Sequence, residues 1–465
     1  MNKGISKMEN VDPHFHKAVG LPAAIATNMN AICGIGPFIT IPAMLTAMGG
    51  PQAIFGWMIG ALVAMADGLV WAELGASMPG AGGTYLYLRE AYQYQTGKLM
   101  PFLFAWTSII SLPLILSTGV IGFVQYLGAF IPGLAPVVSK TIGVVLVLII
   151  VAALYRKIES VKVITVVLWC VMMAAVLLTV IASFSHWDSN LAFSYPKDLL
   201  SSGKFAAGLG AGLVIALYDY TGYSTVAYMG AELKNPGRVM PRAIILSILF
   251  MGMLYLTMQI GVLGTAPWSE LTKSDNVAAF VVSKSWGKVP ALIVSGMIMI
   301  AAAASIFTGL LGASRVPYNA AKDGVFFSSF GNLHPKYSFP NISLLVMGAV
   351  VIVGSLLDLT AVINILTGVT VLIQSLAQIV ALTILRHKQP GLERPYKQFL
   401  YPVPSIIAFF GWVYAFTAIG TTTMLFSIVW VIVGIGVFLV FSYFKKIWPF
   451  GDKEIHEEFL EKANK

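Results

Sequence analysis

The sequence is poor in charged residues and in cysteine. Only 11% of its 465 residues are Asp, Glu, Lys or Arg, whereas soluble globular proteins carry roughly 25%. Hydrophobic residues make up 57% of the chain. The two cysteines, Cys33 and Cys170, lie in apolar stretches and have none of the spacings of metal or redox motifs. This composition excludes a water-soluble enzyme, a disordered chain and a disulfide-stabilised scaffold. It indicates a protein that spans a membrane several times.

Long windows without charge give the expected spans. Residues 18–66 and 398–444, among other windows, hold no Asp, Glu, Lys or Arg, and a membrane-spanning helix needs about 20 apolar residues. Dividing the long windows at their glycine- and proline-rich breaks predicts an all-α integral membrane protein with 12 transmembrane helices. The expected helix centres are residues 34, 63, 115, 147, 174, 218, 252, 302, 348, 373, 411 and 434.

The positions of the basic residues give the orientation. With the N-terminus in the cytoplasm, 23 of the 29 Lys and Arg residues fall in cytoplasmic segments and 6 in outer segments. An excess of Lys and Arg in cytoplasmic loops is the usual orientation signal. We therefore expect a multi-pass protein of the cell (plasma or inner) membrane with both termini in the cytoplasm. The net charge of +9 is then a topology signal, and no nucleic-acid partner is expected.

The first helix is interrupted by Gly34, Ile35, Gly36 and Pro37. Glycine weakens a helix and proline lacks a backbone N–H, so backbone polar groups lose their helical partners at mid-membrane. Such a break is tolerated where those groups face protein or a cavity. A kink that serves only close helix packing is the alternative interpretation.

The sixth helix places Tyr218, Asp219, Tyr220, Thr221 and Gly222 within an apolar run. A buried ionised carboxylate costs several kcal/mol unless it is partnered. We therefore expect Asp219 either to select a cationic group or to carry a proton, and an acid tied to a neighbouring helix is the alternative. Helices interrupted at corresponding positions of two repeats are the best sequence indication of a transporter site.

Three stretches resemble the amino acid–polyamine–organocation permeases. Residues 71–85 (WAELGASMPGAGGTY) resemble that family's stretch after helix 2, residues 230–242 (GAELKNPGRVMPR) its helix 6–7 loop, and residues 314–324 (SRVPYNAAKDG) its helix 8–9 stretch. The resemblance implies a LeuT-like fold, which is a five-plus-five inverted repeat with helices 1 and 6 broken and two helices added. It implies a secondary active transporter that moves amino acids by alternating access, and not an enzyme.

The implied fold divides the chain into four parts. These are a cytoplasmic segment at 1–17, a transport core of helices 1–10 at 18–386, helices 11 and 12 at 387–447, and a cytoplasmic tail at 448–465. The expected partners are the lipid bilayer and a small-molecule amino acid or amine. No cofactor and no metal are expected.

The resemblance also implies a substrate site at the two breaks. Its expected residues are Ile32, Cys33, Gly34, Ile35, Gly36, Tyr218, Asp219, Thr221 and Gly222. In the family, N–H groups at the first break hold the substrate carboxylate, carbonyls at both breaks hold its amino group, and Tyr218 falls at the position of an aromatic gate. Ile35 replaces a serine and Asp219 replaces a small neutral residue. These departures favour cationic amino acids, with a polyamine or other organic amine as the alternative substrate.

Several other polar side chains are weaker candidates. Ser305 and Thr308 of helix 8, with Asn364 and Gln374 of helix 10, could line the cavity or hold an ion. Hydroxyls that bond back to their own helix are the alternative for Ser305 and Thr308. Asp67 and Glu73 of helix 2 are interpreted as gate residues or as a buried pair that adds stability.

The absence of a lysine from helix 5 bears on which ion could drive transport. Several family members place a lysine on helix 5, but here no lysine lies between Lys162 and Lys197, and Trp169 aligns with that position. The remaining options are exchange, a proton on Asp219, or sodium on Ser305 and Thr308 with helix 1 carbonyls. Because hard cations need about six oxygen ligands, an antiporter or a proton symporter is favoured over sodium coupling.

Other function classes fit less well. A channel needs a continuous polar pore, and the predicted spans hold too few polar groups for one. A sensor would be expected to add a soluble output domain, and a membrane enzyme would need catalytic groups, yet no histidine lies within a predicted span. The sequence therefore favours a transporter.

Overall fold

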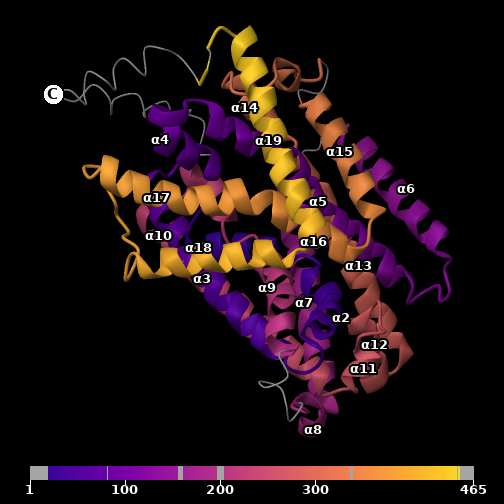
Figure 1. Ribbon diagram of the computed structural model, residues 1–465. Helices are drawn as coiled ribbons and strands as arrows, with labels where there is room; N and C mark the ends of the chain where they lie inside the picture. Colours follow the sequence, from indigo (N-terminus) through magenta and orange to yellow (C-terminus); the bar gives the residue numbers. More distant parts are fainter. Residues whose placement is uncertain are drawn as a thin grey trace.

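The computed structural model describes residues 19–80, 82–155, 161–195, 204–335, 339–447 and 449–450, with the side chains of 161–168 and 204 left out. All regular elements in these ranges are helices (Figure 1). A single parallel β-bridge joins Val19 to Leu233. The predicted segment 1–17 and nearly all of the predicted tail 448–465 lie outside the described residues.

The first span is broken at the predicted place. Helix α1 (Leu21–Cys33) is followed by α2 (Gly36–Met48), and the two halves are bent by 48°. Gly34, with φ of 36°, adopts a conformation that glycine tolerates best. Pro37 lies in the first turn of α2, where its missing N–H removes no helical hydrogen bond. The break is therefore encoded by its glycines and its proline.

The sixth predicted span also changes structure at the expected residues. Helix α9 (Lys204–Tyr220) ends in a turn at 221–224, and the 3-10 helix η1 (Thr225–Glu232) continues the chain. Gly222 in the turn has φ of 122°, which a residue with a side chain rarely adopts. The chain is therefore unwound beside Asp219, as the sequence predicts.

Eight helices in the described residues are long and apolar enough to cross a membrane, or nine if the bent α1–α2 pair is one span. They include α3 (Ala53–Ser77), α5 (Leu99–Leu127), α6 (Pro136–Leu154), α9 with η1, α10 (Pro236–Leu263), α13 (Lys288–Ala313) with α14 (Arg315–Lys322), and α19 (Thr421–Phe444). The remaining one joins α16 (Leu359–Thr370), the π-helix η3 (Val371–Leu376) and α17 (Ala377–Lys388). Shorter apolar helices are α7 (Val161–Ser185, of which Trp169–Ser185 counts here), α12 (Val277–Trp286), α15 (Asn341–Ser355) and α18 (Val403–Ala418).

The short helices lie at the two ends of the bundle. In Figure 1, α8 (Ser189–Ala192), α11 (Trp268–Leu271) and α12 lie at the lower end, and α4 (Thr84–Thr96) and α14 lie at the upper end. The 3-10 helix η2 (Ser328–Gly331) packs against α14. This arrangement leaves the long helices to form the middle of the molecule.

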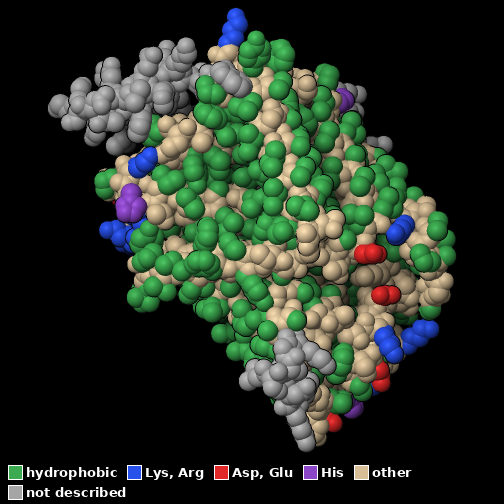
Figure 2. Space-filling model, viewed as in Figure 1, with side chains coloured by type: hydrophobic (Ala, Val, Ile, Leu, Met, Phe, Trp, Pro, Cys, Tyr) green, Lys and Arg blue, Asp and Glu red, His purple; other side chains and the backbone are tan. Residues whose placement is uncertain are grey.

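The middle of the molecule has a buried centre and an apolar outer surface. In α3 and α5, 61% of the most apolar window is buried, whereas in α6 and α19 the share is 22%. The outer helices expose large side chains such as Leu148 of α6 and Ile432 of α19. Figure 2 shows a face that is hydrophobic through its middle, with charged side chains near its edges. Such a surface matches a lipid environment, because apolar side chains are stable against hydrocarbon.

Candidate functional site

A cavity of about 280 Å³ lies where the two breaks meet. Its volume is close to the lower end of the range for small-molecule sites in proteins. Ten of the sequence-predicted residues line it: Ile32, Gly34, Ile35, Gly36, Tyr218, Asp219, Thr221, Gly222, Ser305 and Gln374. Helices α3, α5, α16 and α18 supply further walls. The structure therefore brings together residues that are far apart in the sequence.

Three predicted residues lie elsewhere. Cys33, the last residue of α1, is fully buried in the core and is absent from the cavity wall. Asn364 is also absent from the wall, because it lies one helical turn before Thr367 on the same face of α16 and the lining of the cavity starts only at Leu366. Thr308 lines a separate small cavity. These three residues therefore do not line the central cavity, and Thr308 lies where an ion site was the prediction.

Backbone meets backbone at the two breaks. A Cβ on Gly222 would lie 2.7 Å from the carbonyl carbon of Ala31 and 2.8 Å from the backbone nitrogen of Ile32. Real Cβ atoms do not approach backbone so closely, and backbone cannot move aside as a flexible side chain does. The turn in the sixth span can therefore touch the end of α1 only with glycine at this position.

The first break exposes backbone donors. The N–H of Gly34 donates to the carbonyl of Asn30 at 3.3 Å. Within the described residues, the N–H groups of Ile35 and Gly36 have no acceptor. Unpaired N–H groups at a helix N-terminus attract anionic groups, because the helix dipole adds to their partial charge. A carboxylate in the cavity could therefore accept hydrogen bonds at the start of α2.

Tyr255 of α10 joins carbonyls of both breaks. Its hydroxyl lies 2.9 Å from the carbonyl oxygen of Ile32 and 3.1 Å from that of Asp219, so its single hydrogen is shared between the two. These carbonyls are two of those that the sequence assigns to a substrate amino group. Each carbonyl oxygen can accept two hydrogen bonds, so the contact with Tyr255 leaves room for one more. Tyr255 thus holds the two breaks in register.

Asp219 is buried against the start of α2. Its Oδ2 shares a short hydrogen bond with the hydroxyl of Thr40, and that hydroxyl also lies 2.9 Å from the carbonyl of Gly36. Its other oxygen, Oδ1, has no hydrogen-bond partner within the described residues. A Cβ on Gly36 would lie 2.1 Å from this Oδ1. The side chain of Asp219 therefore connects the half-helices α9 and α2.

A second carboxyl, that of Asp67, lines the same cavity. Asp67 lies on α3 and is only 2% exposed. The hydroxyl of Tyr223, in the turn after α9, forms a short hydrogen bond with Oδ2 of Asp67. The indoles of Trp71 and Trp412 lie beside the carboxyl. The sequence marks Asp67 only together with Glu73, as two acids in one apolar span, and no sequence signal marks Trp412.

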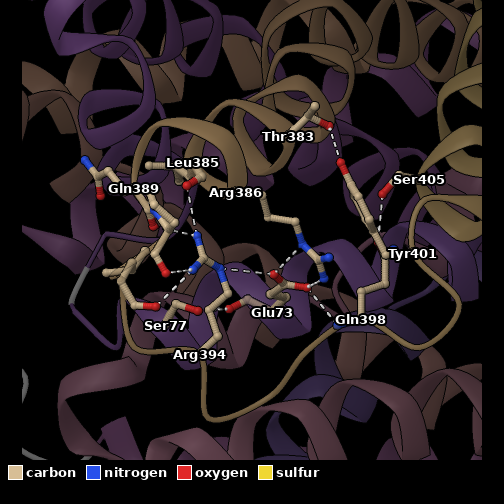
Figure 3. A network of polar contacts seen from close by, with 12 residues as sticks. Glu73, Ser77, Thr383, Leu385, Arg386, Gln389, Arg394, Gln398, Tyr401 and Ser405 are labelled. Carbon is tan, nitrogen blue, oxygen red and sulfur yellow. Dashed lines mark hydrogen bonds and ion pairs between the residues drawn. The ribbon is translucent and has the colours of Figure 1, made fainter. Parts of the chain in front are cut away.

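Asp67 and Glu73 do not form a pair. Glu73, 1% exposed, accepts hydrogen bonds from Arg386 at 2.8 and 2.5 Å and from the backbone N–H of Gln398 at 2.7 Å. Arg394 lies 3.5 Å from Glu73 (Figure 3). Burial raises the pKa of Tyr396, and the nearby negative charge of Glu73 adds to the effect.

This network belongs to the framework and not to the cavity. Arg394 also donates to the carbonyls of Leu385, Gln389 and Leu392, at 2.9 to 3.0 Å (Figure 3). Leu385 lies in the last turn of α17, where its carbonyl also accepts from the N–H of Gln389, and Gln389 is the residue after that helix. The network therefore fastens the end of α17 and the 389–402 connection to α3, and the gate interpretation of Glu73 is not supported.

Tyr218 lies in the cavity wall and contacts α5. Its hydroxyl lies 2.6 Å from that of Thr118. The Thr118 hydroxyl also lies 2.6 Å from the carbonyl of Ile115, so Thr118 donates to that carbonyl and Tyr218 donates to Thr118. The ring of Tyr218 is therefore held across the space between α9 and α5.

A small cavity of about 20 Å³ lies between α1, α7 and α13. Asn30, Gly34, Met172, Ser305 and Thr308 are among its lining residues. The residue that α7 contributes is Met172, three positions after the aligned Trp169, and it supplies no oxygen. The Thr308 hydroxyl bonds back to the carbonyl of Ala304 at 2.9 Å. Among the described residues, no group of three His, Cys, Asp or Glu could hold a metal ion.

A larger hollow of about 700 Å³ lies at one end of the bundle, between α5, α6 and the residues before α16. Its wall includes the charged residues Lys140, Lys273, Asp275 and Asp358. Lys140 donates to the carbonyl of Leu356 at 2.8 Å. This hollow does not include the breaks, so it is distinct from the central cavity.

Apolar helices with two interrupted segments around a cavity that holds two buried carboxyls define a membrane transporter. The chain belongs to the amino acid permease family, whose model matches residues 19–441. It is 26% identical to the serine/threonine exchanger of Bacillus subtilis (strain 168), over 89% of this chain and 93% of that protein. It is also 26% identical to a branched-chain amino acid permease of the same organism, over 89% and 90% of the two chains. Identity to the mouse b(0,+)-type amino acid transporter 1 is 25%, over 93% and 89%.

Proposed function

We propose that this protein is a secondary active transporter that moves amino acids across the membrane by alternating access. The observation that carries the proposal is the meeting of two broken helices at a cavity with unpaired backbone donors. Such breaks offer N–H groups to a carboxylate and carbonyls to an ammonium group, which are the two charged groups of an amino acid. The printed names of the three relatives reported above, a serine/threonine exchanger, a branched-chain amino acid permease and a b(0,+)-type amino acid transporter, agree with this substrate class.

In the proposed complex, the substrate carboxylate accepts hydrogen bonds from the N–H groups of Ile35 and Gly36. The amino group faces free carbonyl lone pairs at both breaks. Tyr218 covers the substrate as an aromatic gate. Support for this role comes from its place in the cavity wall and its hydrogen bond to Thr118 on a different helix.

We propose cationic amino acids as the preferred substrates. Two carboxyls, those of Asp67 and Asp219, line the cavity, and no Lys, Arg or His is found among its described lining residues. In a low-dielectric site this charge distribution favours cations and disfavours anions. A polyamine or other organic amine remains the alternative, because it would use the carboxyls without using the N–H groups of the first break.

The proposed topology has twelve spans, both termini in the cytoplasm, and an inverted repeat of helices 1–5 and 6–10 in the plasma or inner membrane. It requires that the α1–α2 pair, α7, α15 and α18 cross the bilayer in addition to the eight longer helices. With that orientation, α4 and α14 lie on the cytoplasmic side. The cavity extends toward them, to Trp71, Tyr228 and Val316, which corresponds to an inward-facing state.

For coupling, we propose proton-linked transport or exchange and not sodium. The small cavity beside α7 holds Met172 and no carboxylate among its lining residues. The side chains of Asn30, Ser305 and Thr308 are its only oxygen-bearing side chains among the described lining residues. Because a hard cation prefers about six oxygen ligands, this cavity is a poor sodium site.

An uptake panel in liposomes tests the proposal. Purified protein is reconstituted, and uptake of labelled L-lysine, L-arginine, L-serine, L-leucine and putrescine is measured with and without unlabelled amino acid inside. We expect saturable uptake of at least one amino acid, most strongly of a cationic one, and competition by its unlabelled form. Uptake of putrescine without uptake of any amino acid would favour the alternative. An absence of uptake for every compound would contradict the proposed function.

A further inference from the structure

The two carboxyls in the cavity differ in the hydrogen-bond donors that surround them. The Thr40 hydroxyl has one hydrogen and two neighbours, the carbonyl of Gly36 and Oδ2 of Asp219. A helical threonine commonly donates to the carbonyl four residues earlier, which here is that of Gly36. Asp219 must then supply the hydrogen of its own bond to Thr40. The geometry therefore fits a neutral carboxylic acid at Asp219.

Asp67 is surrounded by donors. The Tyr223 hydroxyl bonds to its Oδ2, and the indole groups of Trp71 and Trp412 lie beside it. Oδ1 of Asp67 and Nε1 of Trp412 both lack a well-aligned partner within the described residues. Donors around a carboxyl stabilise its ionised form, whereas burial without a cation stabilises its neutral form. These opposing effects leave Asp67 free to change its protonation.

Among the residues that the structure describes, no cation faces Asp67 from the elements packed around it. The turn after α9 presents Tyr223, α18 presents Trp412, and η1 presents Tyr228, whose ring lies 5.9 Å from that of Trp71. Helix α10 presents the apolar side chains of Ile244 and Ile248 at Gly68, the next residue of α3. The other carboxyl of the cavity is that of Asp219. The charge of Asp67 can therefore be balanced only by a proton or by a bound cation.

We propose that Asp67 holds a proton while the cavity is empty and releases it when a cationic amino acid binds, while Asp219 keeps its proton throughout. The O–H bond of the Asp67 carboxyl breaks, the proton passes to water in the cavity, and the carboxylate charge balances the added positive charge of the substrate. On release of the substrate, Asp67 takes a proton from water again. One proton is thus exchanged for one positive charge. This inference rests on the proposed transport of cationic amino acids.

The pH dependence of L-lysine binding tests the inference. The dissociation constant is measured by scintillation proximity on the purified full chain between pH 5.5 and pH 8. Because binding releases a proton, we expect affinity to rise with pH, by up to about tenfold per pH unit, until Asp67 is ionised in the empty protein. Asp67→Asn should remove this slope, and Asp219→Asn, the matched control, should keep it even if its affinity is lower.

A second variant covers the case in which Asp67→Asn does not fold. Tyr223→Phe removes one donor from the carboxylate, so the pH at which the slope ends should move upward. An unchanged midpoint in Tyr223→Phe would overturn the inference. A slope that survives in Asp67→Asn, or one that disappears in Asp219→Asn, would also overturn it.

The result with L-leucine separates this inference from the proposed function. If neither L-lysine nor L-leucine binds at any pH, the proposed function fails. If L-leucine binds and L-lysine does not, amino acid binding stands and the proton exchange at Asp67 is wrong. If L-lysine binds with an affinity that does not change with pH, the proton exchange alone is wrong.

Discussion

Gly36 lies directly against the carboxyl of Asp219, and a Cβ on Gly36 would come within 2.1 Å of Oδ1. The two residues belong to different interrupted segments. The carboxyl of Asp219 fits in this place because residue 36 has no side chain. The break in the first span leaves space that the acid of the sixth segment occupies. A side chain on Gly36 would therefore first displace Asp219 and only through it disturb the cavity.

Replacing Gly36 with alanine should weaken substrate binding at least tenfold. Overpacking at a tight site costs about 1–3 kcal/mol, and the displaced carboxyl would lose its bond to Thr40. Binding of the transported amino acid is measured by scintillation proximity. Gly312→Ala is a matched control, because a Cβ on Gly312 meets nothing within 4 Å.

A double variant identifies the cause of that loss. Asp219→Ala removes the atom that the new Cβ would strike. The double variant with both Gly36→Ala and Asp219→Ala should therefore lose less binding free energy than the two single variants lose together. Strict additivity would show that the two residues act independently.

Replacing Gly222 with alanine should impair the protein more than the change at Gly36. The φ of 122° is unfavourable for alanine, and the new Cβ would meet the backbone of Ala31 and Ile32. We expect loss of binding together with a lower melting temperature in detergent. A variant with the melting temperature of the wild type would contradict the close approach of the two breaks.

Changes at Tyr218 separate a gate from a contact. Tyr218→Ala removes the ring that spans the cavity, so we expect transport to fall much more than binding. Tyr218→Phe and Thr118→Val each remove the hydrogen bond between these residues and should have similar, smaller effects. Transport and equilibrium binding are compared for each variant. Equal losses of binding and transport in Tyr218→Ala would show that the ring is only a contact.

The framework role of Glu73 predicts a loss of stability. Breaking a buried ion pair by removing one charge costs about 3–5 kcal/mol, because the other charge is left buried. Glu73→Gln should therefore lower the melting temperature clearly. Glu270→Gln is the control, since its partner Lys284 lies 3.6 Å away in an exposed pair, and exposed pairs contribute about 0–1 kcal/mol. Equal melting temperatures for the two variants would show that the network around Glu73 adds little.

The sequence was sufficient to locate the breaks because local chemistry determines them. A single proline or glycine can lie inside a continuous helix, as Pro113 does in α5. Clustered glycine and proline, as at Gly34, Gly36 and Pro37, or glycine beside polar residues, as at Gly222, weaken a helix enough to be recognised without tertiary information. An acid in an apolar span is also visible in the sequence, and for this reason the sequence predicts Asp219 as a site residue. The helix centres could be placed from the charge-free windows because the distribution of charge along the chain is also a local property of the sequence.

Side-chain direction could not be predicted in this way. Cys33 and Asn364 are close in sequence to lining residues, but which side chains reach the cavity and how far it extends along each helix depend on long-range packing. The α7 residue beside the small cavity is Met172, whereas the sequence comparison with the family selected Trp169, three positions earlier. A sequence comparison alone does not determine which side of a helix faces a cavity. The sequence groups Asp67 with Glu73 because both are acids of one span. Only the fold shows that Asp67 faces the cavity and Glu73 faces Arg386 and Arg394.

An experimental density map of the protein with its transported amino acid tests the proposed site most directly. We predict density between the two breaks, with the substrate carboxylate within hydrogen-bonding distance of the N–H groups of Ile35 and Gly36. Density found only in the hollow beside Lys140 and Asp358, with the space between the breaks filled by protein, would contradict the assignment of the central cavity as the substrate site.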